Sequence, residues 1–119
     1  MAEYISEHFK RSEFTCGCGC GLDTVDTGLI YLLELVRARF AVPVTVNSGC
    51  RCLGHNDRVG GSAKSQHLIG RAADIVVAGI EPSDVADYLD SVYPNQYGLG
   101  RYDTFTHIDS RGTKARWQG

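Results

Sequence analysis

Two short segments of the chain carry residue types that bind metal ions. Residues 65–74 read Ser-Gln-His-Leu-Ile-Gly-Arg-Ala-Ala-Asp, and residues 105–109 read Phe-Thr-His-Ile-Asp. Catalytic zinc takes three N or O ligands and keeps a fourth position for water, whose pKa falls from about 16 to about 7. Water with that pKa is a nucleophile at neutral pH. The two segments supply such a ligand set in His67, Asp74 and His107.

The spacing within residues 65–74 lets two of these ligands converge. Gly70 allows a sharp turn between His67 and Asp74, and Ala72 lets neighbouring backbones approach closely. The third ligand must come from across a sheet. Taken singly, each His is more often a surface or core residue, and Asp74 could belong to a turn or a cap. The joint pattern Ser-x-His-x-x-Gly-x-Ala-x-Asp, followed by a His on a terminal strand, favours a metal site.

The cysteines form a second group of metal-binding side chains. They fall in two tight clusters, Cys16, Cys18 and Cys20, then Cys50 and Cys52. An odd number leaves one thiol outside any disulfide scheme, and a reducing cytosol disfavours disulfides. Three roles are open to them: small buried residues, one disulfide bridge between the clusters, or a structural zinc site of four thiolates. The Cys-x-Cys spacing is not that of ordinary zinc ribbons. In each case we expect them to tie the N-terminal segment to the loop carrying Arg51.

Length and composition are those of one small domain. The chain has 119 residues, 43% of them hydrophobic and 22% charged, so we expect one domain over residues 1–119 with the Cys-rich segment 14–22 docked on it. A net charge of -2 and a pI near 6.0 argue against a nucleic acid partner. We also expect a monomer without a membrane span, made in the cytosol because residues 1–14 lack the apolar core of a secretory signal.

Hydrophobic periodicity predicts the elements that position these residues. Helices are expected over residues 6–14, capped by Ser6, over 26–41, capped by Asp26 or Thr27, and from Pro82 to just before Pro94. Strands are expected over residues 42–47, 72–77, 98–102 and 105–109, the last two joined by a turn at Asp103-Thr104. Pro43 makes the first of these an edge or entering strand. Residues 54–66 are rich in glycine and polar side chains, so we expect a long surface loop.

The motifs together resemble the LAS metallopeptidases. This group joins the D-Ala-D-Ala metallopeptidases of bacterial cell walls with lysostaphin-type endopeptidases and the hedgehog signalling domain. The chain is most similar to the D-Ala-D-Ala carboxypeptidase branch (peptidase M15-like), and there to its short single-domain phage and prophage members. The matching motifs are His8-Phe9, Glu13 to Cys16, Ser48 to Arg51, His55-Asn56, Ser65 to Asp74, His107 to Asp109 and Arg116-Trp117.

The resemblance implies a zinc hydrolase that cuts peptidoglycan peptides next to D-amino acids. It further implies an α+β fold in which a small antiparallel sheet carries the ligands and packs against helices. The family's zinc ligands match His67, Asp74 and His107. Arg51 falls where related enzymes place an arginine that binds substrate and polarises the scissile carbonyl, which a guanidinium does through two donors. The alternative is a surface Arg51 paired with Asp57 or Asp109.

The general base is where the chain departs from the family. Many relatives place a carboxylate three residues before the final zinc ligand or a second His two residues before it, and here those positions are Thr104 and Phe105. Neither side chain accepts a proton from water. We expect Asp103, in the turn, to be the general base. Asp109 shares a strand face with His107, so it is either the alternative base or the residue that orients His107. His55 either hydrogen-bonds at the site or is a structural loop residue.

Two functions from different classes follow. The first is a zinc peptidase of wall degradation, either a D-Ala-D-Ala carboxypeptidase or an endolysin-type endopeptidase. Without a signal peptide, such an enzyme reaches the wall during phage lysis, through a membrane pore, or as a virion component. The alternative is a catalytically inactive zinc-containing module that binds the cell wall or has a structural role, which the departure at Thr104 and Phe105 favours.

Overall fold

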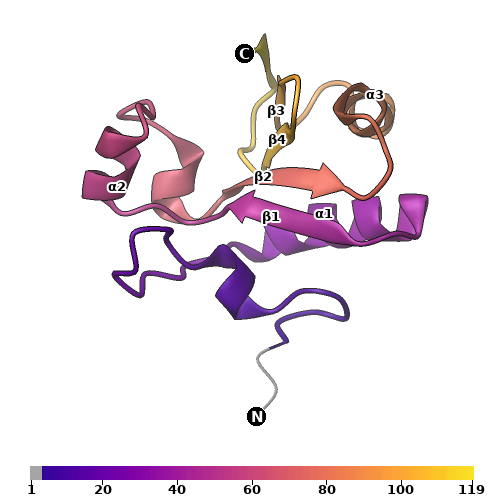
Figure 1. The fold of residues 1–119 in the computed structure, drawn as a ribbon. Helices are drawn as coiled ribbons and strands as arrows, with labels where there is room; N and C mark the ends of the chain where they lie inside the picture. The colour runs from indigo at the N-terminus through magenta and orange to yellow at the C-terminus, as the bar shows by residue number, and fades with distance from the viewer. Residues whose placement is uncertain (1–3) are drawn as a thin grey trace.

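The computed structural model describes residues 4–119, and Met1–Glu3 of the expected domain lie outside the described residues. The helical elements are η1 (Arg11–Phe14), α1 (Thr27–Phe40), α2 (Leu53–Arg58), η2 (Gln66–Ile69) and α3 (Pro82–Val92), of which η1 and η2 are short 3-10 helices. The strands are β1 (Val44–Ser48), β2 (Ala72–Val77), β3 (Gly98–Arg101), β4 (Thr106–Asp109) and β5 (Ala115–Gln118). Figure 1 shows their arrangement.

The strands form one mixed sheet in the order β1-β2-β4-β3-β5. Every neighbouring pair is antiparallel except β3 and β5, which are parallel. The expected α+β class is therefore confirmed, and β1 lies at an edge as predicted. The expected antiparallel pairing holds for β2 and β4, and the sheet is mixed because β5, a strand that the hydrophobic pattern did not predict, pairs parallel with β3.

Alternation along β2 and β4 separates the core from a polar face. Ile75 and Ile108 point into the hydrophobic core, which α1 and α3 cover from one side of the sheet. The neighbouring residues Asp74 and His107 point to the opposite side, because successive strand residues face opposite ways. Asp74 and His107 are also direct partners in the register of the two strands. The sheet thus brings these two predicted ligands together.

The two long helices begin as the sequence predicts. Asp26 caps α1 by accepting a hydrogen bond from the Gly28 backbone N–H (3.1 Å), and Pro82 occupies the first turn of α3. Of the apolar residues of α1 at helical spacing, Phe40 is partly buried against the core and the other four are buried: Leu29, Leu32, Leu33 and Val36. None of the helices within residues 4–119 has the length and apolar character needed to cross a membrane.

Two predicted segments differ from the structure. The helix expected over residues 6–14 is only the 3-10 turn η1, because the Ser6 hydroxyl donates to Glu34 on α1 and does not cap a helix. The loop expected over residues 54–66 begins instead with α2. The Cys52 sulfur caps α2 by accepting from the His55 backbone N–H (3.4 Å), and a thiol is not among the usual capping groups.

Candidate metal centre

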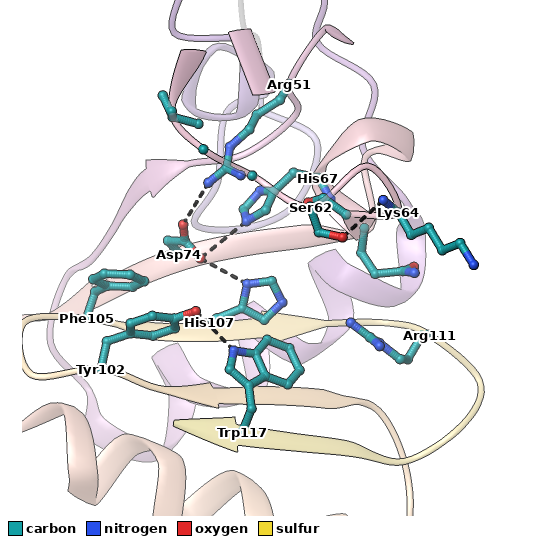
Figure 2. Close-up of a pocket in the computed structure, with 15 residues that line it drawn as sticks. Arg51, Ser62, Lys64, His67, Asp74, Tyr102, Phe105, His107, Arg111 and Trp117 are labelled. Carbon is teal, nitrogen blue, oxygen red and sulfur yellow. Dashed lines mark hydrogen bonds and ion pairs between the residues drawn. The ribbon is translucent and has the colours of Figure 1, made fainter. Parts of the chain in front are cut away.

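Three elements bring the predicted ligands to one place. His67 lies in η2, where Ser65 Oγ accepts from its backbone N–H (3.2 Å), and Gly70 ends this turn in the left-handed conformation with φ of 72°. The predicted sharp turn at Gly70 is therefore present, and β2 then carries Asp74. His107 comes from β4 beside it. Figure 2 shows the three side chains converging from η2, β2 and β4, so that only two of them belong to the sheet.

The distances among the three side chains suit a zinc ion. His67 Nε2 lies 3.3 Å and His107 Nδ1 lies 3.0 Å from Asp74 Oδ1, and all three ligand atoms fall within 4.8 Å of one another. Ligands about 2.0 to 2.1 Å from a tetrahedral zinc ion are about 3.3 Å apart. All three residues are buried. The arrangement therefore needs little adjustment to hold the metal.

The far nitrogen of each imidazole is occupied by an acceptor. His67 Nδ1 lies 2.6 Å from the Gly49 carbonyl oxygen, which can only accept, so Nδ1 carries a proton and Nε2 is the nitrogen turned toward Asp74. His107 Nε2 lies 2.7 Å from Asp109 Oδ2, which leaves Nδ1 facing Asp74. Metal-binding histidines are held by outer partners of this kind. The result is a carboxylate and two ring nitrogens facing each other, a donor set that a divalent cation satisfies.

The pKa values of Asp74 and His107 reflect the same close contacts. Burial raises the pKa of Asp74, but its bonds with His107 and His67 outweigh that effect and hold the pKa well below the usual aspartate range. Burial lowers the pKa of His107, but the carboxylates of Asp109 and Asp74 raise it above its usual value overall. Without a cation, His107 is thus stabilised as an imidazolium between two aspartates. Metal binding at this place releases that proton.

Asp109 holds His107 in position. It is fully buried, and besides His107 it accepts hydrogen bonds from Arg111 Nε (2.8 Å) and a second guanidinium nitrogen (2.8 Å). Burial raises the pKa of Asp109, yet the bonds with His107 and Arg111 lower it to about 2. Its partner in the register is Gly98, where a Cβ would come within 2.2 Å of the carboxylate oxygens. Only glycine leaves room for this buried anion.

Arg51 reaches the centre through Asp74. Its guanidinium donates to Asp74 Oδ2 (3.3 Å), Ser48 Oγ (3.1 Å) and Asn56 Oδ1 (3.2 Å), and its backbone N–H donates to the His67 carbonyl (2.9 Å). The alternative pairing of Arg51 with Asp57 or Asp109 is not what the structure has. The side chain is 13% exposed and lines the pocket in front of the centre.

The three converging side chains open into a pocket of about 510 Å³. One wall is aromatic: Tyr102 stacks on Phe105 with ring centroids 4.3 Å apart, and Trp117 Nε1 donates to the Tyr102 hydroxyl (3.0 Å). Figure 2 shows this wall beside His107, and Lys64 and Arg111 also line the pocket. Sequence reasoning did not predict the wall, although Trp117 belongs to the Arg-Trp motif that it noted.

One pocket residue has an unused acceptor. Gln66, which lines the pocket next to His67, has a buried Oε1 that finds no hydrogen-bond partner among residues 4–119. An unpaired buried amide oxygen is costly. Because Oε1 is shielded from solvent as well as unpaired, a substrate N–H group would reach it only after a rotation of the Gln66 side chain. Sequence analysis gave Gln66 no role, because its side chain points to the pocket only through the turn of η2.

Asp103 and His55 lie away from the centre. Asp103 is exposed in the turn between β3 and β4 and is absent from the pocket lining of the described chain. Its carboxylate would approach the centre only through a movement of that turn. His55 also does not line the pocket, and its ring lies over Gly17, where a Cβ would be 3.2 Å from His55 Nε2. Within residues 4–119, Asp74 is the one carboxylate among the pocket-lining side chains.

Residues 7–109 of the chain match the family model described as Peptidase M15. No curated protein matches the chain significantly. The matched residues include Arg51, the three converging side chains and Asp109, and they end before β5. The match thus covers the part of the chain that builds the centre but not the strand that contributes Trp117 to its wall.

Proposed function

The chain belongs to the peptidase M15 family, and on this premise we propose that it uses a zinc ion held by His67, Asp74 and His107 to hydrolyse peptidoglycan stem or cross-bridge peptides next to D-amino acids. M15 peptidases are metal-dependent enzymes, and the family implies peptidase activity on peptidoglycan. The observation that carries the proposal is the convergence of three buried donor atoms within 4.8 Å at the base of a pocket.

Zinc bound at this place would lower the pKa of water to about 7 and polarise the scissile carbonyl. The protein's own contribution is to fix the ligands. The Gly49 carbonyl fixes the tautomer of His67, and Asp109 fixes the orientation of His107, because each accepts a hydrogen bond from the far ring nitrogen. Asp109 is therefore a positioning residue in this proposal.

Arg51 and Gln66 supply contacts for the peptide. The Arg51 guanidinium lies at the pocket surface next to Asp74, where its donors suit the oxygen of the scissile carbonyl or a terminal carboxylate. A rotation of the Gln66 side chain would bring its unpaired Oε1 to a peptide N–H on the neighbouring side. Lys64 adds a positive charge for a substrate carboxylate, which favours a D-Ala-D-Ala carboxypeptidase over an endopeptidase. Action during phage lysis, or as a virion component, is part of the same proposal.

A second candidate function is a zinc-containing module that binds the wall without cutting it. It is favoured by one observation, that no carboxylate other than Asp74 lines the pocket within residues 4–119. Such a module would hold zinc and peptidoglycan but lack a group that removes a proton from water. The two candidates differ in whether a group near the centre accepts a proton from water, and the predicted base Asp103 does not line the pocket.

Incubation of the zinc-loaded protein with purified peptidoglycan tests the proposal. We expect release of free amino groups, and we expect His67→Ala to abolish both this release and the zinc bound at the centre. His8→Ala is the matched control, because His8 lies outside the pocket and should keep full activity. Binding of peptidoglycan at full zinc content without release of amino groups would establish the second candidate instead.

A further inference from the structure

Four thiols lie together outside the pocket lining of the described chain. The sulfur atoms of Cys16, Cys18, Cys20 and Cys52 all fall within 4.8 Å of one another. The sulfur of Cys18 is 3.5 Å from that of Cys16 and 3.6 Å from that of Cys52, and all five cysteines of the chain are free. Four thiolates about 2.3 Å from a tetrahedral zinc ion have sulfur atoms about 3.8 Å apart. The observed spacing is close to that requirement.

The backbone of residues 16–22 is shaped to gather three of these thiols. The Cys16 backbone N–H donates to the Leu22 carbonyl (2.7 Å), which closes the segment into a loop. Within it, the Gly19 N–H donates to the Cys16 carbonyl (3.2 Å), and Gly19 has a φ of 85°, which few residues other than glycine adopt. This turn directs the alternating cysteines toward one point, although their spacing is not that of zinc ribbons.

Backbone N–H groups point at the sulfur atoms. The Cys52 N–H donates to Cys16 Sγ (3.4 Å), and the His55 N–H donates to Cys52 Sγ (3.4 Å) at the start of α2. Such donors stabilise the negative charge that a metal-bound thiolate carries. Cys50 is buried and does not belong to the group. A site of four thiols plus one separate buried thiol explains why the chain has an odd number of cysteines.

We propose that Cys16, Cys18, Cys20 and Cys52 bind a second zinc ion with a structural role. Soft thiolates in tetrahedral array select zinc, and four protein ligands leave no position for water or substrate. Each thiol gives its proton to solvent as it binds, so no oxidant is required. This inference is independent of the zinc ion in the proposed catalytic centre.

The second ion would join the N-terminal loop to the residue that follows Arg51. Three ligands come from residues 16–20 and the fourth is Cys52, whose neighbour Arg51 donates through its backbone to the His67 carbonyl. The ion therefore fixes the start of α2 and, through it, the backbone that presents the Arg51 side chain to the pocket. Its effect on catalysis is one of position, since no sulfur atom lines the pocket of the described chain.

Metal content of the full chain, purified in reductant without chelator, tests the inference. We expect two zinc ions per chain in the unmodified protein, one in Cys20→Ser and one in His67→Ala. Cys50→Ser is the matched control and should keep both ions, because Cys50 is a cysteine outside the group. Cobalt loaded into His67→Ala should give thiolate-to-cobalt charge-transfer absorption, a readout that needs no cysteine variant to fold.

The outcomes separate the two sites. One ion in the unmodified protein and none in His67→Ala would overturn the second site while leaving the proposed function intact. If the unmodified protein binds one ion, and His67→Ala keeps it while Cys20→Ser loses it, the result would support the cysteine site and contradict zinc binding at the proposed catalytic centre. Fewer than five free thiols after denaturation would also overturn the inference, since a disulfide would then occupy these cysteines.

Discussion

Two aspartates flank His107 in the sequence, Asp103 four residues before it and Asp109 two residues after it, and they differ sharply in their surroundings. Asp109 is buried and bonded to the ring of His107, whereas Asp103 is exposed in a turn. The residue pattern could identify both as candidates, because strand alternation puts Asp109 on the face of His107. It could not identify Gly98 as the neighbour of Asp109, since that contact arises from the register of β3 and β4.

We expect Asp109→Asn to weaken zinc binding by roughly 10- to 100-fold, because an amide is a poorer acceptor for the proton of His107 Nε2. Excess zinc should restore activity.

We expect Asp103→Asn to keep both zinc affinity and activity, because its side chain does not line the pocket. Zinc titration and peptidoglycan hydrolysis measure both effects. A zinc-independent loss of about 10²- to 10⁴-fold in Asp103→Asn would show that the turn moves and that Asp103 is the general base.

Arg51 is expected to act on substrate and not on the metal. Arg51→Ala should lower turnover by about 10²- to 10³-fold while zinc content stays unchanged, because the guanidinium is not one of the three donors at the centre. Arg51→Lys should recover part of the activity, since a lysine lacks the two-donor fork. Steady-state kinetics together with zinc analysis tests this. Unchanged turnover per folded molecule, with a loss of stability, would assign Arg51 a structural role through Ser48 and Asn56 alone.

At the scale of elements, the N-terminal segment is held to α1 by one carboxylate. Glu34 accepts hydrogen bonds from the Ser6 hydroxyl (2.5 Å), the His8 backbone N–H (2.8 Å) and the His8 ring (2.6 Å). Burial raises the pKa of Glu34, but the bonds from Ser6 and His8 lower it below its usual value overall. A carboxylate whose pKa falls on folding stabilises the folded state at neutral pH.

We expect Glu34→Gln to lower the free energy of unfolding by about 1 kcal/mol at neutral pH. Because the folded-state pKa is depressed, this contribution is complete above the unfolded pKa near 4.5 and is lost as the pH falls through the folded-state pKa. The difference between the two proteins should therefore shrink under acid. Denaturant titrations at several pH values measure it. Glu7→Gln is the control, since the Glu7 side chain is 83% exposed, and an equal loss there would contradict the assignment.

The elements that the sequence predicted are those with strong periodic signals. The apolar spacing of α1, the proline at the start of α3 and the buried run of β2 specify structure locally. The elements that it missed have an unusual local signal, as in α2, or depend on distant contacts, as in β5. A cysteine caps α2, and β5 is anchored by Arg116, which donates to Asp90 (2.8 Å) and to the Tyr93 carbonyl (2.6 Å). A parallel pairing with β3 has no signal in the local sequence.

At the scale of the molecule, the sheet separates the hydrophobic core from the pocket. The apolar core lies between the sheet and helices α1 and α3, while the pocket occupies the opposite face. The candidate centre joins η2 to two strands, so an ion bound there crosslinks elements that are distant in the chain. Binding to the folded state alone raises stability, by about 2.7 kcal/mol when free zinc is 100 times its dissociation constant.

We therefore expect removal of zinc by a chelator to lower the melting temperature, and readdition of zinc to restore it. His67→Ala should reduce this shift but not abolish it, because the proposed cysteine site would still respond to the chelator. Scanning calorimetry with and without chelator measures the shift in each protein. A melting temperature that does not respond to chelator in the unmodified chain, at full initial zinc content, would contradict a structural contribution from either ion.

The central claim is that the zinc-loaded protein hydrolyses peptide bonds next to D-amino acids. Mass spectrometry of muropeptides before and after digestion tests it most directly, because the mass lost identifies the bond that is cut. We expect loss of a terminal D-Ala for a carboxypeptidase, or splitting of the peptide with addition of one water for an endopeptidase, and neither change with His107→Ala. Muropeptide masses that stay unchanged while the centre is fully loaded with zinc would contradict the claim.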